Sequence, residues 1–189
     1  MARERKFSME ELYSVTKETL LNHGYEGFNF GLLAERLDIA RGTIYKYFEN
    51  KEELISSFML YEMDQFLLEL KGIEDYKGFE AQFHFLFDLF FSHSKIYHII
   101  EIGQRMPTNT NDTVRVNMEK LDKNRLKMYQ HLQAFIDLGK KEKKIKAHLP
   151  DSLILGYMFQ SIAIPNHFNI DQTIWVNSIK EMIGHGIFN

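Results

Sequence analysis

Residues 41–47, with the sequence RGTIYKY, carry side chains suited to contacts with DNA. A lysine can reach a guanine edge or a phosphate, and the methyl or hydroxyl group of Thr43 can meet a base edge in the major groove. The hydroxyl groups of Tyr45 and Tyr47 suit phosphate oxygens, and Gly42 would let a helix backbone come close to a groove wall. The candidate DNA-binding residues are Asn29, Arg41, Gly42, Thr43, Tyr45, Lys46, Tyr47 and Lys51.

Helical spacing separates this stretch into an inward and an outward face. Successive residues of an α-helix lie about 100° apart, so Ile44 and Phe48 point in nearly the same direction, about 40° from each other. Gly42 and Lys46 occupy the opposite direction. Any short amphipathic helix shows a core face and a polar face, but the combination of a bare glycine with bases and hydroxyl groups favours a contact surface.

Charge composition does not predict a nucleic-acid partner. The 189 residues have a formal net charge of −3, and the first 54 contain eight Lys and Arg against ten Asp and Glu. The prediction therefore depends on where the few basic residues point. A protein partner for the 41–51 surface is the alternative, and salt dependence separates the two because phosphate contacts weaken steeply as salt rises.

The residues and motifs that several other classes of protein need are absent from the sequence. The chain has no cysteine, which excludes disulfides and a thiolate nucleophile and fits a reducing cytoplasm. We find no HExxH motif, no phosphate-cradling glycine loop and no G-x-S-x-G motif, so an enzyme is not expected. No signal peptide or membrane-spanning stretch is apparent, and the chain is predicted to be soluble and cytoplasmic, without a cofactor.

Helix signals recur along the chain, and strand signals are nearly absent. Capping boxes at Ser8–Glu11 and Asn50–Glu53 predict that helices begin there, and Asn29 can cap a helix between them. Gly139 and the lysines after it are expected to fray a helix end as a solvated last turn. The sequence predicts an all-α chain, with later helices at roughly 75–93, 95–104, 111–142, 151–164 and 171–186.

The segment from Gly24 to Leu54 closely resembles the DNA-binding segment of TetR-type transcriptional regulators. The motifs that carry the resemblance are Gly24-Tyr25, Leu33-Ala34-Glu35, Gly42-Thr43-Ile44-Tyr45, Tyr47-Phe48 and Lys51-Glu52-Glu53-Leu54. The resemblance implies an N-terminal three-helix helix-turn-helix domain at residues 1–50. It also implies a larger helical domain at residues 51–189 that dimerises and binds a small molecule.

Two residues depart from the family pattern. Asp38 stands where the turn usually has glycine, and aspartate tolerates the left-handed conformation better than most residues. Ala40 replaces the usual serine or threonine, so the cap and a phosphate contact are missing. At the N-terminus, Arg3, Arg5 and Lys6 are either an arm along the DNA backbone or a solvated terminus.

Bulky apolar side chains of the C-terminal region could line an effector site. Phe and Met suit an aromatic or amphipathic ligand because methionine repacks easily, and the alternative is that these residues are simply core. The candidate ligand-binding residues are Phe83, Phe87, Phe90, Tyr97, Glu101, Met128, Phe135 and Phe159. A buried Asp88 or Glu101 could balance a cationic ligand, or could face solvent or pair with a neighbour. His84 and Asp88 have metal-ligand spacing on one helix face, but with eight histidines such coincidences are expected and no metal is predicted.

The last two predicted helices carry the candidate dimer interface, which is Leu153, Tyr157, Trp175, Ile179, Met182 and Ile183. In the TetR family the corresponding helices of two subunits pack as a four-helix bundle. A two-fold dimer matches a palindromic DNA site, with half-sites about one DNA turn apart. The resulting hypothesis is a homodimeric regulator of double-stranded operator DNA, most simply a repressor that a small apolar or amphipathic effector releases, with no membrane partner.

Overall fold

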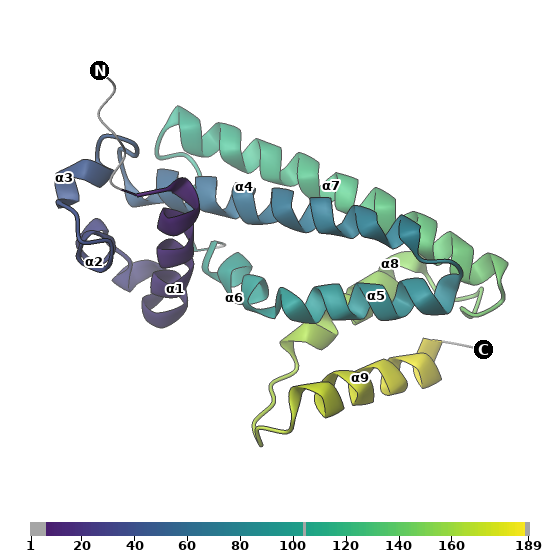
Figure 1. Ribbon diagram of the computed structural model, residues 1–189. Coiled ribbons are helices and arrows are strands. Elements are labelled where there is room, and N and C mark those ends of the chain that lie inside the picture. Colours follow the sequence, from purple (N-terminus) through teal and green to yellow (C-terminus); the bar gives the residue numbers. More distant parts are fainter. Residues whose placement is uncertain (1–6, 104, 188–189) are drawn as a thin grey trace. The chain divides into compact units, whose positions relative to one another are not determined.

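The computed structural model describes residues 7–103 and 105–187, with the side chains of residues 96–98, 101 and 187 left out of the description. The described residues form helices and no β-strand (Figure 1), as the sequence predicts. The helices are α1 (Met9–Gly27), α2 (Phe30–Arg36), α3 (Arg41–Ile44), α4 (Lys51–Leu70), α5 (Phe79–Ser92), α6 (Ser94–Gly103), α7 (Asp112–Lys141), α8 (Asp151–Gln160) and α9 (Gln172–Ile187). Short 3₁₀ turns at Lys71–Asp75 and Ser161–Ala163 follow α4 and α8.

The predicted capping boxes set the starts of two helices. At α1 the Ser8 hydroxyl accepts a hydrogen bond from the Glu11 amide at 3.0 Å, and the Glu11 carboxylate accepts one from the Ser8 amide at 3.4 Å. At α4 the Asn50 side chain accepts a bond from the Glu53 amide at 2.8 Å. These bonds satisfy amides of the first helical turn, which have no partner within the helix.

Contacts divide the chain into two compact units. The first comprises the described residues of Met1–Asp64 and His98–Lys123, and the second comprises the described residues of Gln65–Tyr97 and Asn124–Asn189. These units are defined by contacts, whereas the predicted boundary at residue 50 separates two functions. That functional boundary stays a prediction.

The first unit encloses an apolar core to which α1, α2, α3 and α4 all contribute. Its fully buried members include Leu12, Leu33, Ile44 and Phe58. The beginning of α7 lies along α4, where the buried Asn117 amide donates to the hydroxyl groups of Ser56 and Ser57 at 3.1 and 3.0 Å (Figure 1). The helix-turn-helix segment therefore shares its core with the first part of α4.

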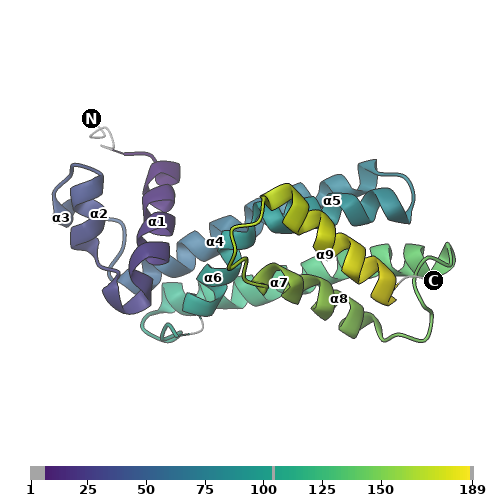
Figure 2. The ribbon, with the colours of Figure 1, turned by 90° about the horizontal axis from the view of Figure 1, so that it is seen from below.

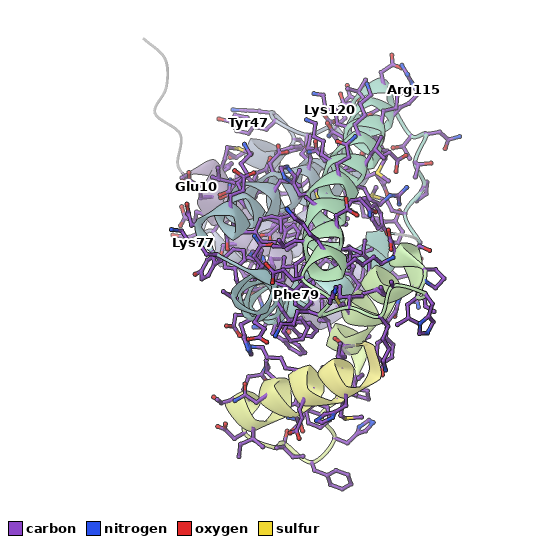
Figure 3. The ribbon with its side chains drawn as sticks, turned by 90° about the vertical axis from the view of Figure 1, so that its right-hand side faces the viewer. Glu10, Tyr47, Lys77, Phe79, Arg115 and Lys120 are labelled. Carbon is purple, nitrogen blue, oxygen red and sulfur yellow. The ribbon has the colours of Figure 1, made fainter. Side chains whose placement is uncertain are left out.

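The second unit has an aromatic core. The rings of Phe79 and Phe135 stack with centroids 4.8 Å apart, and those of Phe90 and Phe159 stack at 4.6 Å. Figure 3 shows Phe79 inside this unit. The last helix, α9, packs against α5 (Figure 2).

Several predicted helix ends differ from the structure, and the helix expected at 151–164 ends at Gln160 in a 3₁₀ turn. The helix expected to start near residue 75 begins at Phe79, because Gly78 has a φ of 83° and breaks the helical path. Conversely, α7 continues through Gly139 to Lys141 instead of fraying. The lysines that follow Gly139 are not simply solvated, since Lys140 pairs with Asp151 and Lys144 lies 2.7 Å from a Glu80 oxygen.

Candidate nucleic-acid interface

The segment after the turn presents the predicted outward face to solvent. Ile44 and Phe48 are buried, as their helical angles predict, and Thr43 is partly buried. The exposed residues of this segment are Arg41, Gly42, Tyr45, Lys46 and Tyr47. Regular α-helix covers only Arg41–Ile44, and the Tyr47 and Phe48 amides then bond back to the Ile44 carbonyl at 2.9 and 3.1 Å. The contact face is therefore one helical turn extended by a hydrogen-bonded turn.

Aromatic contacts hold the two tyrosines of this face in place. The Arg41 guanidinium donates to the Tyr45 hydroxyl at 2.8 Å and lies 5.4 Å from the centre of the ring. The same ring meets Phe30 edge-on at 4.9 Å, and Phe7 meets Tyr47 edge-on at 5.7 Å. Tyr45 is 47% exposed and Tyr47 is 37% exposed, despite these contacts. A face braced in this way loses less conformational entropy when it binds.

No described residue requires a glycine at position 42. A Cβ atom built there would have no atom within 4 Å, and the residue does not adopt a positive φ. Gly42 therefore leaves space at the surface rather than inside the fold, which is the arrangement needed for close approach of another molecule.

The two departures from the TetR pattern have clear structural consequences. Asp38 adopts a φ of 49°, the left-handed conformation of the turn, as predicted. Ala40 is the N-cap residue of α3 and forms no side-chain cap. The turn between α2 and α3 thus survives without glycine, but α3 begins without the usual cap.

The structure assigns Asn29 a structural contact. Its side-chain oxygen accepts bonds from the amides of Gly31 and Leu32 at 2.9 and 3.2 Å, and its side-chain nitrogen lies 3.3 Å from the Gly27 carbonyl oxygen. Asn29 therefore caps α2, as its position predicts, and its role in DNA binding stays a prediction.

Tyr25 binds the side chain of Lys51, a contact that was not predicted from the sequence. The Lys51 ammonium donates to the Tyr25 carbonyl at 2.9 Å and lies 3.9 Å from the centre of the Tyr25 ring. The Tyr25 hydroxyl donates to the Glu52 carboxylate, and burial together with this acceptor raises the pKa of Tyr25. Gly24, with a φ of 63°, provides the backbone conformation that precedes this contact. The glycine–tyrosine pair of the motif thus holds the start of α4.

Five of the candidate ligand-binding residues are phenylalanines that, together with Phe79, form a continuous series of ring contacts. Phe83, Phe87, Phe90, Met128 and Phe135 are buried in the second unit, and Phe159 is partly buried against Phe90. Tyr97 and Glu101 are on α6, and their side chains lie outside the described residues. The cluster is the packed core of its unit, and its role in ligand binding stays a prediction.

One groove beside this cluster lies between α5 and α9 and has a volume of about 700 Å³. Phe83 and His84 line it from α5, and Lys180 lines it from α9. Asp88 is exposed and pairs with Lys180 at 2.6 Å, so it is not a buried carboxylate awaiting a cationic ligand. Among the described residues, no group of three or more His, Asp or Glu side chains is placed to hold a metal ion.

The candidate dimer residues fall into two groups. Leu153 and Met182 are 60% and 67% exposed, whereas Ile179 and Ile183 are only 4% and 2% exposed within the single chain. Ile179 and Ile183 therefore offer almost no surface to another molecule. The candidate interface narrows to the exposed Leu153, Tyr157 and Met182, with the partly exposed Trp175.

A helix-turn-helix segment with an exposed second helix, in an all-helical chain, is the arrangement typical of DNA-binding regulators. Residues 12–58 match the family described as bacterial regulatory proteins, tetR family. The helix-turn-helix segment is therefore similar to the DNA-binding part of TetR-family regulators. The family and the named relatives are regulators rather than enzymes.

Two relatives cover different shares of the chain. An uncharacterised HTH-type transcriptional regulator of Haemophilus influenzae is 32% identical over 75 residues, which is 39% of this chain and 40% of that protein. The fatty acid metabolism regulator protein of Bacillus subtilis is 23% identical over 186 residues, or 95% of each chain.

Solved structures share the fold. The Bacillus subtilis regulator FadR in complex with stearoyl-CoA has a TM-score of 0.71 at 21% identity, covering 95% of this chain and 100% of that one. The ketosteroid regulator KstR2 of Mycobacterium tuberculosis has a TM-score of 0.74 at 13% identity, covering 98% and 97%. In the part of the chain that the structure describes, no helix has the length and apolar character needed to cross a membrane.

Proposed function

We propose that the protein is a homodimeric repressor that binds operator DNA and is released by an apolar or amphipathic effector. Residues 1–50 would read DNA, and residues 51–189 would dimerise and bind the effector. The observation that carries the DNA assignment is the exposed face formed by Gly42, Tyr45, Lys46 and Tyr47 on a braced helix-turn-helix.

Few basic residues serve this face, so each one matters. Arg36 and Lys17 pair with carboxylates at 3.1 and 2.9 Å, whereas Arg41 and Lys46 form no ion pair with any described residue. Arg41 and Lys46 both lie on the outward face. Two such faces, presented by a dimer about one DNA turn apart, would contact successive major grooves.

The effector proposal rests on the relatives and on the buried aromatic cluster. One relative is named for fatty acid metabolism and one structural neighbour holds stearoyl-CoA. Long apolar chains suit a site lined by phenylalanine and methionine, so we propose a fatty acyl thioester as the effector class. Release requires that the effector binds the DNA-incompetent conformation more tightly than the competent one.

The DNA assignment is tested with duplexes that the wild-type protein selects from a random-sequence library. We expect Lys46→Ala and Tyr47→Phe each to weaken binding, by about tenfold for an interaction worth roughly 1.4 kcal/mol. Phenylalanine keeps the ring contact with Phe7 and removes only the hydroxyl group. Lys77→Ala, an exposed lysine of the second unit (Figure 3), is the matched control and should bind as the wild type does.

Salt titration separates DNA from a protein partner. Binding through phosphates should fall steeply between 50 and 200 mM salt, with a slope that Lys46→Ala reduces by about one. If both variants bind the selected duplex as tightly as the wild type, the groove assignment is wrong.

The effector class is tested on the preformed complex with stearoyl-CoA. We expect stearoyl-CoA to release the duplex and free coenzyme A to leave it bound, because the acyl chain supplies the apolar contact. Stearate is included as a third arm to show whether the thioester is needed. Release by none of these compounds would reject an acyl effector and leave the DNA assignment intact.

A further inference from the structure

The side chain of Asn111 joins the start of α7 to the segment that leaves the contact face. Its Nδ2 lies 3.2 Å from Glu49 Oε2 and 3.4 Å from Glu53 Oε2. Glu49 follows the contact face by two residues, and Glu53 lies in the first turn of α4. One amide group thus contacts both sides of the junction between α3 and α4.

The same junction is also tied to α4. The Glu53 carboxylate accepts a bond from the Glu49 amide at 2.8 Å, and the Asn50 side chain accepts one from the Glu53 amide at 2.8 Å. Two carboxylates therefore share this site, and the amide of Asn111 is the donor that reaches both. The amide donor offsets the repulsion between the Glu49 and Glu53 carboxylates.

The start of α7, which directly follows Asn111, is itself attached to α4. A few residues further along α7, Asn117 is buried and bonded to Ser56 and Ser57 of α4. The start of α7 is thus held on α4, and Asn111 extends this attachment to the end of the contact segment.

Asn111 also caps α7, but with a different atom. Its Oδ1 accepts a bond from the Val114 amide at 2.9 Å, the usual N-cap arrangement. Because capping uses the oxygen and the junction contact uses the nitrogen, substitutions can separate the two.

We propose that Asn111 is a positioning residue for DNA binding, which rests on the proposed function. It acts through Glu49 and Glu53 to hold Lys46 and Tyr47 in the orientation that fits a groove. Any change at the start of α7 is thereby transmitted to the contact face. The geometry assigns this role to the Nδ2 group and not to the helix cap.

The test compares Asn111→Asp with Asn111→Ser. Both replacements keep an oxygen that can cap α7, and neither keeps the amide donor. Aspartate also places a third carboxylate beside Glu49 and Glu53. We expect affinity for the duplex selected by the wild type to fall on the order of tenfold in Asn111→Asp, and less in Asn111→Ser. The helix content measured by circular dichroism should not change.

A second substitution supplies the rescue. The second substitution is Glu49→Gln, combined with Asn111→Asp. In this double variant the amide donor is at position 49 and the carboxylate is at position 111, the reverse of the wild type, and the net charge is unchanged. We expect this double variant to recover affinity to within about threefold of the Glu49→Gln single variant. A purely structural role for Asn111 would give no such recovery.

The outcomes are distinct. Equal affinity of the wild type and Asn111→Asp, or a loss that Glu49→Gln does not recover, would overturn the positioning role while the DNA assignment stands. Failure of the wild type to select any duplex would instead reject the proposed function.

Discussion

Two glycines in this chain have opposite surroundings. A Cβ atom at Gly42 would have open space around it. A Cβ atom at Gly139 would lie 2.6 Å from the Ile145 side chain and 2.7 Å from the Phe79 ring. Contacts this short require the neighbours to move, so Gly139 serves the packing of the second unit, whereas Gly42 serves the surface.

Gly42→Ala should leave the fold intact and weaken DNA binding. Alanine favours helix by up to about 1 kcal/mol over glycine, so the melting temperature should hold or rise. The added methyl group lies on the face proposed to approach a groove wall, and we expect about a tenfold loss of affinity for the selected duplex. Thermal melting and gel shift measure the two effects. Unchanged affinity would show that the backbone at Gly42 does not approach DNA.

Gly139→Ala should instead destabilise the protein. Overpacking of a core costs about 1–3 kcal/mol, which exceeds the gain in helix propensity of about 1 kcal/mol or less. Denaturant unfolding measures the free energy, and Gly42→Ala is the matched control for the propensity term. A rise in stability equal to that of the control would mean that Phe79 and Ile145 move aside at no cost.

At the scale of elements, the sequence predicted the features that depend only on residues close together in the chain. The Ser8 and Asn50 caps were readable because an N-cap and its partner lie three residues apart. The start of α5 could not be predicted in this way, because it depends on the positive φ of Gly78. The contact between Tyr25 and Lys51 joins residues 26 apart in sequence and needs the folded first unit.

The burial of side chains on α9 shows the same limit. Its apolar positions could be read from the sequence, but Ile179 turns inward and Met182 turns outward. Only the packing of α9 against α5 decides between these faces.

The start of α8 should be sensitive to acid. The Asp151 carboxylate accepts bonds from Lys140 and from Gln133, the latter at 2.7 Å, and these bonds lower the pKa of Asp151 below its ordinary value of 3.8. A lowered pKa means that the contribution to stability is complete above 3.8 and is lost as the pH falls through the lowered value.

Asp151→Asn should therefore destabilise the protein at neutral pH by about 1 kcal/mol or less, because the pair is partly exposed to solvent. The difference between the variant and the wild type should shrink as the pH falls below 3.8. Urea unfolding at pH 7 and at successively lower pH measures this difference. A difference that is the same at every pH would assign the effect to something other than the Asp151 charge.

For the whole molecule, α8 and α9 carry exposed apolar residues that packing within a single chain does not explain. Leu153 and Tyr157 are one helical turn apart and share a face of α8, and Met182 on α9 is also exposed. Exposed apolar side chains gathered on one surface are typical of association sites. In a two-fold dimer the same surface of each subunit meets its own copy, so every substitution acts twice.

We expect Leu153→Lys combined with Met182→Lys to convert the proposed dimer to a monomer. The change places four charges in an interface that should exclude water, and burying unpaired charge is strongly unfavourable. Light scattering after gel filtration gives the mass, and operator affinity should fall with it because a monomer contacts one half-site only. Leu126→Lys is the matched control, since Leu126 on α7 is 61% exposed and lies outside the proposed interface. If the double variant remains a dimer while the control behaves as the wild type, the two chains must associate through another surface, and the spacing of their contact faces would have to be derived from that surface.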